Sequence, residues 1–139
     1  MTTKKSAYIC LVLIAVMAVM GAYAYPHLPV EVISHWDAAG KPDGYMPRIF
    51  GVYLAPLVSF VVFLIIFLAP RFDPLKVNIE YFRKYYDGLA IVLLIFLLHV
   101  QIIVLLFNLG YRFNIVQLLA PMIGGFFFYL GILIQHTRR

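Results

Sequence analysis

Charged residues are scarce in this sequence. Of its 139 residues only 12% are Asp, Glu, Lys or Arg, whereas 64% are hydrophobic. A soluble domain of this length cannot bury so large an apolar fraction in one core, so the composition favours a membrane protein. The net charge of +5 comes from short segments that would face anionic lipid, and it therefore does not indicate direct nucleic-acid binding.

Cysteine is nearly absent, and the motifs of common enzymes are missing. The lone Cys10 lies in an apolar run, where it predicts neither a disulfide nor a cysteine metal site. The sequence contains no HExxH, no glycine-rich phosphate loop and no recognisable nucleophile constellation. We therefore expect a protein that is not an enzyme and that carries no cofactor.

Long uncharged runs are what the sequence does contain. They cover residues 6–30, 49–70, 88–111 and 113–137. Each can cross a ~30 Å hydrocarbon layer as a helix of about 20 residues, which pairs its own backbone groups. The sequence thus predicts an all-α integral membrane protein, a single membrane domain over 1–139. It would be a four-transmembrane-helix bundle with helices at about 7–25, 50–69, 88–108 and 114–135.

The basic residues predict an orientation. Eight of the eleven Lys and Arg residues lie on one side of the expected helices: Lys4, Lys5, Arg71, Lys76, Arg83, Lys84, Arg138 and Arg139. The other side has Lys41, Arg48 and Arg112. By the positive-inside rule both termini and an inner loop at 70–87 are cytoplasmic, and an outer loop at 26–49 faces outward. We expect a multi-pass protein of the plasma membrane.

The first apolar run also fits a secretory signal peptide, because Ala22-Tyr23-Ala24 follows it like a small-residue cleavage site. The run from Ala7 to Ala24 is longer than the ~7–15 residues of a signal-peptide core, which favours a retained helix.

Small residues recur at helical spacing in three of the expected helices. The three sets are Ala15, Ala18 and Ala22; Gly51, Ala55 and Ser59; and Ala120, Gly124 and Gly131. Small side chains let helix backbones approach closely in lipid, so we expect these faces to pack against other helices.

The outer loop is rich in turn-forming and polar residues. Prolines and glycines indicate tight turns, above all at Asp43-Gly44. Imidazole and carboxylate groups are ordinary zinc ligands, so His27, His35, Asp37 and Asp43 form a candidate metal site. Their spacing matches no compact zinc motif, and the alternative is that His35 and Asp37 hydrogen-bond the backbone of the loop.

Polar side chains also occur within the expected spans. His99, Gln101 and Gln117 should point into the bundle, because such groups are costly in hydrocarbon. No Asp, Glu, Lys or Arg lies at a comparable depth in these spans. This favours interhelical hydrogen bonds over a transport path, although a small transporter or channel subunit stays as an alternative.

The inner loop predicts a short helix on the membrane surface after Asp73-Pro74. Leu75, Ile79 and Phe82 form an apolar stripe at helical spacing. It is either an interfacial linker or a docking surface for a cytoplasmic protein, and the candidate docking residues are Asp73, Pro74, Asn78, Phe82 and Arg83.

Several of these segments together resemble one known family. Leu28-Pro29 followed by residues 35–45, HWDAAGKPDGY, is similar to the signature of the SdpI immunity-protein family and its N-terminal domain of unknown function. Residues 72–75 and 78–86 resemble the family's inner loop, and Gly131 with the basic end resembles the segment before its C-terminal part. Ile33 and Asp37 differ from the proline and asparagine usual there, and the C-terminal part of many members has no counterpart up to Arg139.

The resemblance implies immunity and signalling: protection from a secreted membrane-active toxin peptide, and a regulatory protein held at the inner face. Our first interpretation is accordingly a non-enzymatic membrane protein that recognises such partners, and self-association into a homo-oligomer stays open. The candidate recognition loop consists of His35, Trp36, Asp37, Gly40, Pro42, Asp43, Gly44 and Tyr45. Transport and membrane metal binding are the alternatives.

Overall fold

The structure of the chain is a computed structural model that describes residues 2–72 and 76–137. Its elements are α1 (Thr3–Ala24), the 3-10 turn η1 (Tyr25–His27), β1 (Glu31–Trp36), β2 (Pro42–Pro47), α2 (Arg48–Phe72), α3 (Lys76–Tyr81), α4 (Arg83–Asn108) and α5 (Ile115–Thr137). Within the described residues four helices are long and apolar enough to cross a membrane: α1 continued by η1, α2, α4 and α5. This confirms the four predicted long helices.

Most of the long helices extend beyond the predicted bounds, because polar residues at their ends continue the helical turns. α1 begins at Thr3, before two lysines, and α4 begins at Arg83. The short helix predicted after Asp73-Pro74 is also present, as α3, although Leu75 of its predicted apolar stripe lies outside the described residues. The inner loop is therefore mostly helical.

The prediction of an all-α protein is wrong in the outer loop. β1 and β2 pair there as an antiparallel hairpin, with Glu31 opposite Pro47 and Trp36 opposite Pro42. The strands are only six residues long. Proline and glycine residues bound and interrupt them, and these residue types indicate turns more strongly than strands.

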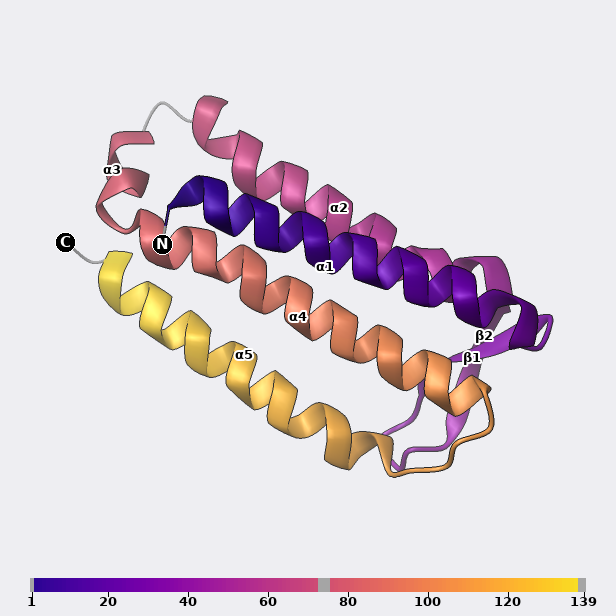
Figure 1. The fold of residues 1–139 in the computed structure, drawn as a ribbon. Helices are drawn as coiled ribbons and strands as arrows, with labels where there is room; N and C mark the ends of the chain where they lie inside the picture. The colour runs from indigo at the N-terminus through magenta and orange to yellow at the C-terminus, as the bar shows by residue number, and fades with distance from the viewer. Residues whose placement is uncertain (1, 73–75, 138–139) are drawn as a thin grey trace.

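The long helices run side by side, with the hairpin at one end of the molecule and α3 at the other (Figure 1). We call these the hairpin end and the α3 end. α4 contacts α1, α2 and α5, and α1 also contacts α2, whereas α5 contacts no described helix except α4. The predicted four-helix bundle is thus a three-helix core of α1, α2 and α4, with α5 added on one side.

The core uses other faces of the helices than the small-residue pattern predicts. On α2, Ser59 is fully buried as expected, and Gly51 lies against the hairpin rather than a helix. On α1 the buried positions are Ser6, Cys10, Met17, Gly21 and Ala24, whereas Ala18 is half-buried and Ala15 and Ala22 are exposed. Ala120, Gly124 and Gly131 of α5 are also exposed. The prediction for α1 and α5 is wrong because the larger Met17 and Leu133 occupy the contacts instead.

Candidate functional site

The hairpin is fixed to the helices at its base. Val32 of β1 is 1% exposed, and it lies so close to Gly51 that a Cβ there would come within 2.3 Å of a Val32 methyl group. A glycine is needed at this position because any side chain would push β1 away from the first turns of α2.

A second attachment joins β1 to the end of α4. The Asn108 side chain accepts a hydrogen bond from the Ile33 amide at 2.7 Å and donates one to the Ile33 carbonyl at 2.9 Å. It pairs with both backbone groups of this residue, as a neighbouring strand would. The hairpin is therefore held by specific contacts to two helices.

Asp37 organises the turn between the strands, at residues 37–41. The tight turn predicted at Asp43-Gly44 is wrong, because both residues lie within β2. Its Oδ1 accepts hydrogen bonds from the amides of Ala39 and Lys41, at 2.9 and 2.8 Å. Gly40 follows with φ of +76°, a left-handed conformation that favours glycine. The predicted alternative, in which His35 and Asp37 hydrogen-bond the loop backbone, is confirmed for Asp37 and wrong for His35, whose ring contacts the Asp43 carboxylate instead.

His35 and Asp43 face each other across the hairpin. His35 Nδ1 lies 2.5 Å from Asp43 Oδ1, and the two side chains are 72% and 46% exposed. Gly44 makes this possible, because a Cβ on it would lie 2.7 Å from the His35 Cβ. Tyr45 on β2 is 62% exposed, so the hairpin presents a paired histidine and aspartate and an aromatic ring to its surroundings.

Trp36 lies on the other side of the hairpin and packs inward. Its ring makes an edge-to-face contact with Phe107, with the centroids 5.3 Å apart, and it borders the buried cluster of Ile103, Phe107 and Ile115. Its buried Nε1 has no partner among the described residues. We expected the Trp36 ring to be a contact for a partner; in the structure it mainly anchors the hairpin.

The candidate metal ligands are not brought together. His27 Nδ1 lies 3.2 Å from the Tyr23 carbonyl of its own helix, Asp37 holds the turn, and only His35 and Asp43 are in contact. Residues 2–72 and 76–137 contain no cluster of three or more His, Cys, Asp or Glu side chains that could hold a metal ion.

Gln101 confirms the prediction of interhelical hydrogen bonds. It is 1% exposed, and its Nε2 donates to the carbonyls of Met17 on α1, at 3.0 Å, and Val52 on α2, at 3.2 Å. The Val52 carbonyl is available because its usual helical donor would be residue 56, which is a proline without an N–H group. A side chain of α4 thus satisfies a backbone group that Pro56 leaves unpaired.

The two other polar residues in the spans, His99 and Gln117, differ in their exposure and in their contacts. His99 Nε2 lies 3.2 Å from the carbonyl of Leu118 on α5, which confirms an interhelical role. Gln117 is exposed, and only its backbone amide is bonded, to the side chain of Asn114 at the start of α5. The prediction that Gln117 points into the bundle is wrong because α5 is covered on one side only.

The inner-loop candidates are described in part. Asp73 and Pro74 lie outside the described residues, and of Asn78 only the backbone in α3 is described. Phe82 is half-buried, with its ring 6.3 Å from that of Tyr86. Arg83 pairs with Asp87 at 2.9 Å and with Glu80 at 3.4 Å. Its charge is therefore engaged within the protein.

Two residues of these sites were not predicted. Asp87 is 1% exposed although it is charged, and its only sequence signal is Arg83 four residues earlier. Asn108 also donates to the Val104 carbonyl four residues earlier, but its role in the hairpin has no local signal, because Ile33 is 75 residues away in the sequence.

Comparison with known proteins finds a family that matches part of the chain. A family model, that of a domain of unknown function (DUF1648), matches residues 12–60. No curated protein and no solved structure matches the chain. The matched stretch contains most of α1, the whole hairpin and the first half of α2. The chain is thus similar to this domain in the part that builds the hairpin and its attachment to α2.

Proposed function

We propose that this chain is a non-enzymatic, multi-pass protein of the plasma membrane that recognises a partner through its hairpin. The hairpin end would face outward and the α3 end the cytoplasm, as the distribution of Lys and Arg favours. The partner on the outer side would be an amphipathic, membrane-active peptide, intercepted before it inserts.

The rigid presentation of exposed groups on the hairpin is the observation that carries this proposal. Val32 and Asn108 fix the base, and Asp37 fixes the turn. The His35–Asp43 pair and the Tyr45 ring remain exposed at the helix ends. Such a preorganised surface loses little conformational entropy on binding, and tyrosine is common among residues that dominate binding energy.

The resemblance of residues 28–45 to the SdpI signature supports the choice of a toxin peptide as the partner. By the same resemblance, a regulatory protein would bind at the α3 end. The resemblance concerns a family trait and gives weaker support than the geometry of the hairpin.

The first prediction tests recognition by survival of cells that express the protein while exposed to a membrane-active peptide encoded near its gene. We expect Tyr45→Ala and His35→Ala to reduce protection by about tenfold or more, because truncation of a dominant contact costs about 2 kcal/mol or more. Membrane levels of each variant, measured in parallel, should stay unchanged.

Tyr111→Ala is the matched control, since Tyr111 follows α4 at the hairpin end and is also 62% exposed. It should leave protection intact. Trp36→Ala should lower the amount of folded protein instead, because the ring packs on Phe107. Equal protection by the Tyr45 and Tyr111 variants would contradict the recognition surface. Absence of any protection by the wild type would contradict the immunity role, and flux and metal-binding assays would then test the alternatives.

A further inference from the structure

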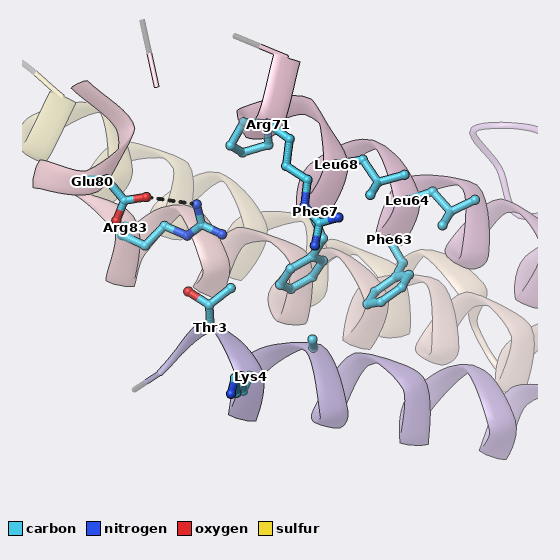
Figure 2. A pocket seen from close by; sticks show the side chains of 11 residues that line it. Thr3, Lys4, Phe63, Leu64, Phe67, Leu68, Arg71, Glu80 and Arg83 are labelled. Atoms are coloured by element: carbon cyan, nitrogen blue, oxygen red, sulfur yellow. Dashed lines mark hydrogen bonds and ion pairs between the residues drawn. The ribbon is translucent and has the colours of Figure 1, made fainter. Parts of the chain in front are cut away.

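A cavity of about 690 Å³ opens between α1 and α2 at the α3 end. Its rim contains three basic residues from three helix ends, Lys4 of α1, Arg71 of α2 and Arg83 of α4, together with Glu80 of α3. Figure 2 shows Arg71 reaching from α2 toward Phe67, with Lys4 on α1 across the cavity. Positive charge therefore dominates the rim.

The charges on this rim are not equivalent. Arg83 is paired with Glu80 and with the buried Asp87, so it forms part of the wall. Lys4 and Arg71 are both exposed, and neither has an ion pair with another described residue. Two basic groups, one on each side of the cavity, are thus available for an anion.

The floor of the cavity is apolar. Phe63 and Phe67 of α2 line it, with their rings in contact at a centroid distance of 4.9 Å. Phe63 precedes Arg71 by eight residues, which corresponds to about 12 Å along a helix. The cavity therefore joins a basic rim to an apolar floor that extends from Arg71 to Phe63 along α2.

We propose that this cavity binds one anionic phospholipid. The phosphodiester would lie between Lys4 and Arg71, and the start of an acyl chain would cover Phe63 and Phe67. A free phosphate ion would use the rim but leave the floor uncovered. Basic pockets between transmembrane helices on the cytoplasmic side are suited to such headgroups, since anionic lipids are concentrated in that leaflet. The inference rests on the proposed membrane insertion and orientation.

The second prediction tests this site with the full chain purified in zwitterionic detergent. Phosphatidylglycerol added to the micelles should raise the unfolding temperature and appear as a bound lipid in native mass spectrometry. Phosphatidylcholine should do neither. The double variant Lys4→Gln/Arg71→Gln should bind phosphatidylglycerol about thirtyfold more weakly, since each basic residue near the membrane surface contributes roughly a factor of five.

The matched control is Lys5→Gln/Lys84→Gln, which removes the same charge from the same end outside the lining of this cavity. It should retain the wild-type affinity. Both variants replace exposed side chains, and their unfolding temperatures without lipid report whether they fold. Equal effects of the two lipids on the wild type, or equal losses in the two double variants, would overturn the proposal.

Glycerol phosphate serves as the headgroup without acyl chains, and a full stabilising effect from it would show an ion site instead of a lipid site. Membrane insertion is checked separately, by resistance of the protein to alkaline carbonate extraction. An extracted protein would overturn both proposals, whereas a retained protein that does not discriminate between the lipids would overturn only this one.

Discussion

A primary amide offers a donor and an acceptor a short distance apart, and Asn108 uses both on one backbone residue. The Ile33 N–H and C=O would otherwise lie unpaired on the edge of β1. Leaving both Ile33 groups without a partner in a partly buried place would cost more free energy than the Asn108 amide loses when it gives up its hydrogen bonds to water. One side chain thus helps to fix the position of the whole hairpin relative to α4.

The third prediction compares two asparagine-to-aspartate changes at the hairpin end. Asn108→Asp should lower stability by about 1–3 kcal/mol, because the carboxylate cannot donate to the Ile33 carbonyl and repels it. Asn114→Asp should be nearly neutral, because Asn114 only accepts a hydrogen bond, from the Gln117 amide. Thermal unfolding in detergent micelles gives both values, and a larger loss for Asn114→Asp would contradict this account.

Some interactions of single residues can be predicted from the sequence, and others cannot. The structural role of Asp37 was predicted, because its hydrogen bonds are to amides two and four positions away in the chain. The pairing of His35 with Asp43 was not predicted. The contacts of Asn108 and Gln101 depend on residues 49 to 84 positions away. Composition and spacing do not encode which distant carbonyl is free, so Asn108 was missed and the partners of Gln101 were not predicted.

At the scale of the elements, α2 depends on its neighbours to accommodate Pro56. The proline removes the helical donor for the Val52 carbonyl, and Gln101 replaces it from α4. The close approach requires Gly21 on α1, since a Cβ there would lie 2.7 Å from Val52 Cγ1 and 3.3 Å from Gln101 Nε2. The three core helices meet at this point.

The fourth prediction is a double-mutant cycle between Pro56 and Gln101. Gln101→Leu should destabilise the wild type by about 1–2 kcal/mol, because it leaves the Val52 carbonyl unpaired. In the Pro56→Ala background the helix supplies its own donor, so Gln101→Leu should cost less there. The free energies of unfolding of the four proteins give the coupling. Purely additive losses would show that the hydrogen bond to Val52 has no energetic role.

The hairpin shows why short strands are harder to predict from the sequence than long apolar helices. The tight turn predicted at Asp43-Gly44 is wrong, because both residues lie within β2 and the chain turns at residues 37–41 instead. The strands were not predicted either, because six-residue segments with prolines at their ends have weak β signals. Their stability comes from Val32 and Ile33 packing and bonding against helices, which is tertiary information.

At the scale of the whole molecule, the long helices were predictable because uncharged runs of this length have few alternatives. Which helices form the core was not, since nothing in the sequence distinguishes α5 from the other spans by length or charge. α5 is the least covered of the four, with its small residues exposed.

The fifth prediction concerns orientation. Single cysteines introduced at position 41, in the hairpin turn, and at position 78, in α3, should react with a membrane-impermeant thiol reagent from the outside and from the cytoplasm respectively. The experiment uses a Cys10→Ala background, in which the buried native thiol is removed. Reaction of both positions from the same side would contradict the arrangement of the four spans.

The one-sided attachment of α5 has a consequence for the order of assembly. During synthesis the chain up to residue 108 already contains every helix of the three-helix core, and α5 emerges after them. Its contacts to the other described helices are all with α4, the preceding long helix, joined to it by a short connection. α5 can therefore dock after the core is complete and can separate from it without opening the core, which makes it the part of the protein expected to unfold first.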